Sequence, residues 1–232
     1  MQATPIKPLP FFSILRLHSN FPRPVGDSSN PLTHSFDVRV SIVKGASVQS
    51  IVFEGGKALV PQFIEAGLAQ VRLGAIAVGT SCGFMAQHQE EISCALPVPF
   101  ISSSLLQLAA LRNQYGKHAN IGVITFSEEI LSSTQWFQSL AMGCVTVSGL
   151  STSSHLYRVI KDDLLELDCE QARLSVQAAA SSLMERSPNL RAVILECTNL
   201  GPYRSAVETI CGCPVFDYND LMASSWYLAL AQ

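Results

Sequence analysis

Charged side chains are scarce in this sequence of 232 residues, where they make up 14% of the total and give a formal net charge of -3. A protein that binds nucleic acid needs a basic surface, so this composition argues against a nucleic-acid partner. No apolar run approaches the length of a membrane span, and the 48% hydrophobic residues therefore indicate a buried interior. We expect a globular enzyme or binder of small molecules that has no membrane partner.

Secretory and metal-binding patterns are also missing. Pro5, Pro8 and Pro10 interrupt any signal-peptide core, and the seven cysteines are scattered without a disulfide framework. Cys211 and Cys213 have no second Cys or His pair at metal-ligand spacing. The sequence therefore predicts free thiols in a reducing cytoplasm and no bound metal.

Strand-like apolar runs alternate with helix-like segments along the whole chain. The expected strands are 11–17, 37–43, 75–79, 98–101, 121–125, 144–148, 192–196 and 215–216. The expected helices are 60–73, 84–94, 104–115, 131–142, 168–187, 203–210 and 218–231. Such alternation predicts an α/β fold with parallel strands and right-handed helical crossovers. We place residues 1–101 plus 204–232 in a first lobe and residues 102–203 in a second.

Two cysteines end apolar runs at equivalent places in the two lobes. Cys82 closes the run from Gly74, and Cys197 closes the run from Arg191. Because loops at the carboxyl ends of strands converge on a crevice, the two thiols are expected to face each other across one site. Such a pair can take a proton from one face of a substrate and return one to the other face.

Unpaired cysteines are more often inert core residues, and that interpretation stays open for Cys82 and Cys197 taken alone. It is our interpretation of Cys94, Cys144, Cys169, Cys211 and Cys213. The start of a helix after each strand-end thiol would favour the thiolate, whose ordinary pKa is about 8.5. Gly83 permits a tight turn, and Thr198 with Asn199 offers donors for a substrate carboxylate.

The segment that follows the first strand, His18 to Asp27, carries a second group of polar residues. Arg23 is a charged donor that can clamp an anionic substrate, with Ser19 beside it. An ordinary surface turn explains the same composition, and the sequence by itself favours that simpler interpretation.

The two cysteine motifs, Thr80-Ser81-Cys82-Gly83-Phe84 and Glu196-Cys197-Thr198-Asn199-Leu200, resemble those of the aspartate/glutamate racemase superfamily. The resemblance runs from about Phe11 to Leu228 and implies two pseudo-symmetric lobes, each a mainly parallel sheet flanked by helices. It also implies catalysis by Cys82 and Cys197 without metal, pyridoxal phosphate or any other cofactor. The expected substrate-binding residues are Ser19, Arg23, Thr80, Ser81, Gly83, Thr198 and Asn199.

Three departures from the glutamate racemase pattern bear on the substrate. Gly83-Phe84 stands where those enzymes have Asn-Thr, Asn199 replaces a His, and His18-Ser19 replaces an Asp-Ser pair. These changes argue against an acidic amino acid, whereas the two-thiol chemistry is retained. Phe84 favours a less polar ligand.

The resulting hypothesis is a cofactor-independent racemase or epimerase of a small carboxylate or hydantoin-like carbon acid. One alternative is an enzyme that uses a single thiol, resembling maleate isomerase or arylmalonate decarboxylase. A second is a small-ligand binder without turnover. Superfamily members are often dimeric, so a homodimer is one expected assembly.

Overall fold

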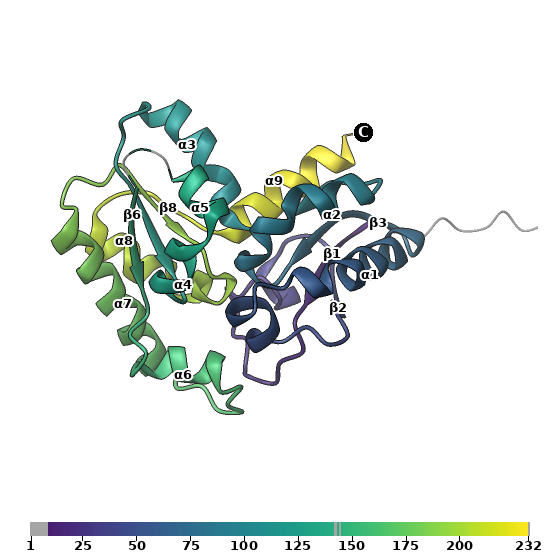
Figure 1. Cartoon of the computed structure of the whole chain (residues 1–232), viewed down its shortest axis with the longest axis horizontal. Helices are drawn as coiled ribbons and strands as arrows, with labels where there is room; N and C mark the ends of the chain where they lie inside the picture. The colour runs from purple at the N-terminus through teal and green to yellow at the C-terminus, as the bar shows by residue number, and fades with distance from the viewer. Residues whose placement is uncertain (1–8, 142, 144, 232) are drawn as a thin grey trace, which may run out of the picture.

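The computed structural model describes residues 9–141, 143 and 145–231. In these residues the chain forms two four-stranded parallel sheets, and the two sheets define two lobes (Figure 1). The strand orders are β2-β1-β3-β4 and β6-β5-β7-β8, so the second sheet repeats the order of the first. This repetition confirms the expected two-lobed α/β fold.

The first sheet is built around β1. Its strands are β1 (Phe11–Arg16), β2 (Val38–Ile42), β3 (Ala75–Thr80) and β4 (Phe100–Ile101). Its helices are α1 (Val60–Arg72) and α2 (Gln89–Ala95), with short helical segments at Pro31–Thr33, Gln49–Phe53, Lys57–Leu59 and Gly83–His88. Alternate residues of β1 enter two different apolar clusters, one with Phe11 and Leu15 and one with Phe12 and Ile14. Both faces of this strand are therefore buried, as its continuous apolar run predicts.

The second sheet is built around β5 in the same way. Its strands are β5 (Ile121–Thr125), β6 (Val145–Gly149), β7 (Ala192–Leu195) and β8 (Val215–Phe216). The helices that follow in this half are α3 (Leu108–Tyr115), α4 (Glu128–Ser133), α5 (Gln135–Leu140), α6 (His155–Lys161), α7 (Cys169–Arg186) and α8 (Arg204–Cys211), with short segments at Ser104–Gln107 and Thr198–Tyr203. The sequence analysis does not anticipate α6, and Cys144 lies outside the described residues.

The chain returns to the first lobe later than expected. Residues 204–216 belong to the second lobe, because Val215 and Phe216 of β8 pair with Val193 and Ile194 of β7. Only α9 (Tyr218–Leu230) crosses back, and it packs on β3 and β4 of the first sheet (Figure 1). The predicted boundary at residue 204 is therefore wrong, since the two-residue strand β8 completes the second sheet before the crossing.

The hydroxyl of Tyr218 fastens α9 to the first sheet. It donates to the Ile101 carbonyl at 2.7 Å and accepts from the Thr80 amide at 2.9 Å, and the residue is 1% exposed. Gly79 makes room for it, because a Cβ at that position would collide with the hydroxyl oxygen. Among the helices described, none is long and apolar enough to cross a membrane.

We predict that Tyr218→Phe lowers the free energy of unfolding by about 1–3 kcal/mol, because it leaves a buried amide and a buried carbonyl short of a partner. Chemical denaturation measures the change. Tyr227→Phe is the matched control, since that residue is 58% exposed on the same helix. Equal stability of the two variants would contradict the assigned role.

Candidate active site

The ends of β3 and β7 bring the two strand-end thiols to one place between the lobes. Cys82 lies two residues after β3, and Cys197 lies two residues after β7. The Thr198 hydroxyl donates to the Ser81 carbonyl at 2.7 Å and joins the two strand ends directly. Cys82 and Cys197 both line the cavity formed there.

Most of the residues expected to form the site line this cavity. They are Ser19, Arg23, Ser81, Cys82, Gly83, Cys197 and Asn199. Seven further wall residues were not expected from the sequence, and they are Leu17, Phe21, Val48, Val52, Phe126, Ile160 and Glu196. The cavity volume is ≈ 20 Å³, which is room for about one water molecule. A substrate of several heavy atoms therefore needs the walls to move apart.

Thr80 and Thr198, expected to contact substrate, do not line the cavity. The Thr80 hydroxyl donates to the Cys82 carbonyl at 2.9 Å, and the Cys82 amide donates back to it at 3.3 Å. Thr198 is equally buried and is committed to Ser81. Both threonines shape the turns that present the thiols.

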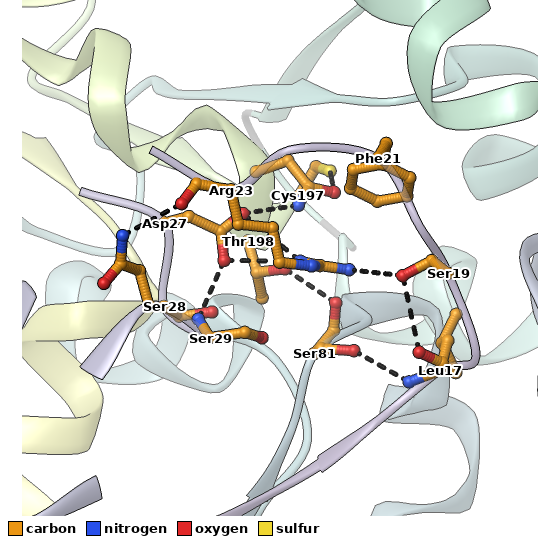
Figure 2. A network of polar contacts seen from close by, with 12 residues as sticks. Leu17, Ser19, Phe21, Arg23, Asp27, Ser28, Ser29, Ser81, Cys197 and Thr198 are labelled. Carbon is orange, nitrogen blue, oxygen red and sulfur yellow. Dashed lines mark hydrogen bonds and ion pairs between the residues drawn. The ribbon is translucent and has the colours of Figure 1, made fainter. Parts of the chain in front are cut away.

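The Arg23 segment is a built network rather than a surface turn. Arg23 Nη1 pairs with Asp27 at 3.2 Å, and its Nη2 donates to the Ser19 hydroxyl at 3.1 Å (Figure 2). Asp27 also accepts from Asn199 Nδ2 at 2.6 Å, and Asn199 Oδ1 accepts from the Cys197 thiol at 3.5 Å. One chain of contacts thus runs from the first-lobe arginine to the second-lobe cysteine.

The second lobe also holds the start of this segment. The Asp163 carboxylate accepts from the Asn20 amide at 2.6 Å, from Asn20 Nδ2 at 2.8 Å and from the Phe21 amide at 3.1 Å. Asp163 has a φ of 53°, a conformation that acidic residues adopt more readily than most. These contacts place the Phe21 ring at the cavity, and the Arg23 guanidinium lies over that ring at 4.4 Å.

Both thiols are held in the protonated form, contrary to the expectation from the helix starts. Burial and, to a smaller extent, the nearby Glu196 together raise the pKa of Cys82 to about 12, while the Phe84 amide opposes the shift. Burial and Glu196 likewise raise the pKa of Cys197 well above its ordinary value, against the Asn199 amide. Desolvation of the charged form therefore outweighs the amides at the start of each helical segment.

Glu196 is the functional candidate to which sequence reasoning gave no role. It is 0% exposed, and its Oε2 accepts from the Thr125 hydroxyl at 2.7 Å. Oε1 has no hydrogen-bond partner among the described residues and lies against Gly83, where any Cβ would collide with it. Burial raises the pKa of Glu196 to about 7 despite the Thr125 bond. The sequence signal that could have identified it is the position of one acidic residue between an apolar strand and a cysteine.

The two-lobed architecture is shared with solved structures of known proteins. No protein-family model matches the chain. Its fold is that of the aspartate/glutamate racemase-like superfamily. The allantoin racemase of Pseudomonas fluorescens matches 96% of this chain and 92% of its own, with a TM-score of 0.60 and 16% identity. Unliganded arylmalonate decarboxylase matches 96% of this chain and 92% of its own, with a TM-score of 0.59 and 13% identity. The match to the Picrophilus torridus aspartate racemase covers 94% of each chain, with a TM-score of 0.58 and 15% identity.

Similarity in sequence points to a different group of enzymes. The chain is 26% identical over 221 residues to dimethylsulfoniopropionate lyase 7 of Emiliania huxleyi, which covers 90% of this chain and 64% of that protein. Lyase 6 of the same organism is 26% identical over 234 residues, 93% of this chain and 60% of that protein. The chain therefore spans somewhat less than two thirds of the length of these relatives.

The buried Glu196 predicts a pH dependence of stability. Its folded-state pKa of about 7 lies above the ordinary 4.5, so the folded protein holds a proton that the unfolded chain releases. The contribution of this proton to stability is present below about pH 4.5 and is lost as the pH rises to about 7, by about 3 kcal/mol at most.

Urea denaturation between pH 5 and pH 8 measures this loss, and Glu196→Gln is expected to flatten it. Glu185→Gln removes the same charge from the exposed surface of α7 and should follow the wild-type slope. A slope that Glu196→Gln leaves unchanged would refute the assignment.

Proposed function

We propose that this protein is an enzyme that removes a proton from the carbon next to the carboxylate of a small substrate, with a thiol of the Cys82–Cys197 pair as the base. We further propose β-elimination from a sulfonium carboxylate of the dimethylsulfoniopropionate type as its reaction. The observation that carries the proposal is the meeting of two strand-end thiols, one from each lobe, at a single buried cavity.

The sequence relatives support the substrate. Four lyases of Emiliania huxleyi named for dimethylsulfoniopropionate match at least 90% of the chain at 23–26% identity. That compound is a small carboxylate, in accord with the carboxylate expected from the sequence. Arg23 supplies the cation for the carboxylate, since Ser19 and Asp27 hold its guanidinium at the cavity wall.

In the proposed reaction, the thiolate takes the proton from the carbon next to the carboxylate. The electron pair of the broken C–H bond forms the new C=C bond, and the C–S bond breaks with its electron pair going to sulfur. The products are dimethyl sulfide, acrylate and a protonated thiol, which is the form of the free protein. The thiolate forms again when the next substrate binds and the thiol releases its proton. The reaction needs a thiolate, so the raised pKa of each thiol requires that substrate binding favour its ionisation.

Racemisation or epimerisation of a carboxylate or hydantoin-like substrate is the second candidate. It is favoured by the presence of both thiols at the same cavity, because inversion needs an acid and a base on opposite faces of the carbon. Elimination needs only one base. A chain in which one cysteine is dispensable therefore performs elimination or a one-thiol decarboxylation rather than racemisation.

The proposal predicts that the purified chain releases dimethyl sulfide from dimethylsulfoniopropionate, measured by gas chromatography of the headspace. Loss of the base is expected to cost about 100-fold or more in rate, so Cys82→Ser or Cys197→Ser should show that loss. Cys94→Ser is the control, since that thiol is exposed on α2.

Parallel reactions in deuterium oxide with hydantoins and small carboxylates test the second candidate. Deuterium uptake with inversion, lost in both single variants and unaccompanied by dimethyl sulfide from the sulfonium substrate, would replace elimination by racemisation. Absence of both activities would contradict the proposal.

A further inference from the structure

We propose that Glu196 determines substrate specificity: its carboxylate makes the cavity select ligands that carry a cationic onium group beside a carboxylate, over neutral ligands of the same shape. The inference rests on the proposed function for the location of the substrate. It adds a role in binding to a residue that neither the cysteine chemistry nor the arginine network uses.

One carboxylate oxygen of Glu196 lacks a hydrogen-bond partner among the described residues. The side chain is fully buried and lines the cavity, with Oε2 held by the Thr125 hydroxyl at 2.7 Å. Oε1 has no hydrogen-bond partner within the described part of the chain. Burying a carboxylate oxygen without a partner costs free energy. A ligand group that enters the cavity and interacts favourably with this oxygen therefore gains binding energy.

The charged residues around the cavity leave Glu196 without a described counter-ion. Arg23 is the one basic residue among the described cavity walls, and it is already paired with Asp27 at 3.2 Å in a buried contact. No ion pair within 4.0 Å joins Glu196 to any described Lys, Arg or His. Asp27 thus balances the charge of Arg23, and an ionised Glu196 has no cation of its own, so a cationic group of the ligand is favoured beside it.

The Glu196 carboxyl group occupies space that is open only because residue 83 is glycine. A Cβ at position 83 would collide with Oε1 and approach the Glu196 carbonyl oxygen to 2.7 Å. Glycine is therefore required for the carboxyl group to occupy its place beside the Cys82 turn. The departure at Gly83 from the glutamate racemase pattern thus has a structural reason, which is the room taken by the acidic side chain.

Aromatic rings complete a surface suited to an onium group. Phe21, Phe84 and Phe126 line the same cavity as Glu196. Phe126 is kept in place by stacking on Tyr157, with ring centroids 4.5 Å apart. Aromatic rings and a carboxylate together attract alkylated cations, which have no N–H or S–H to donate and gain only from charge and contact.

The test compares two ligands that differ in one charge. They are 3-(trimethylammonio)propionate and 4,4-dimethylpentanoate, in which a quaternary carbon replaces the quaternary nitrogen. Isothermal titration calorimetry with the full chain should show the onium ligand binding at least about tenfold more tightly. Glu196→Gln should abolish that preference by weakening the onium ligand alone, and Glu185→Gln should retain it.

Several results would overturn the inference. Equal affinities of the wild-type protein for the two ligands would do so without any variant. Equal weakening of both ligands in Glu196→Gln would assign Glu196 to the carboxylate instead, as a protonated donor. Dimethyl sulfide release with an unchanged ligand preference in Glu196→Gln would refute this inference and leave the proposed function standing. A ligand preference that depends on Glu196, without dimethyl sulfide release from the wild-type protein, would support this inference and contradict the proposed function.

Discussion

The burial of one acidic side chain between two strand-end cysteines is the constraint on which the site depends. Glu196 follows β7 directly, is anchored by Thr125 at the end of β5, and occupies space that Gly83 leaves open in the opposite lobe. Its carboxyl group therefore lies directly against the turn that carries Cys82. Burial also raises the pKa of Glu196 and of both thiols, so the packing of the site determines the proton affinity of all three groups.

This arrangement keeps both thiols protonated in the free protein, and we propose that a bound substrate changes that balance. An isolated buried thiolate beside an ionised carboxylate is doubly unfavourable, because burial removes water and the neighbouring charge repels the thiolate. A ligand that carries a positive charge offsets both effects. In the function that we propose, the network of Arg23, Asp27 and Asn199 binds the opposite end of the ligand, where a carboxylate needs donors.

Much of the fold follows from local sequence signals, whereas the decisive site residue does not. Continuous apolar runs predicted β1 and β5, and the helix predicted over 168–187 is present as α7 (Cys169–Arg186). The Asp168 carboxylate caps the start of α7 by accepting from two amides. The late return of the chain was missed because β8 has only two residues and is defined by its pairing with β7. Glu196 was missed because its burial depends on Gly83 and Thr125, which are distant in the sequence.

We infer that both thiols are protonated in the free protein and that a cationic ligand favours their ionisation. Thiolate absorbance near 240 nm, taken as the difference between the wild-type protein and the Cys82→Ser/Cys197→Ser double variant, measures this at pH 7.5. We expect no difference without ligand and an increase on addition of 3-(trimethylammonio)propionate. A thiolate signal already present in the free protein, or no increase at saturating ligand, would contradict it.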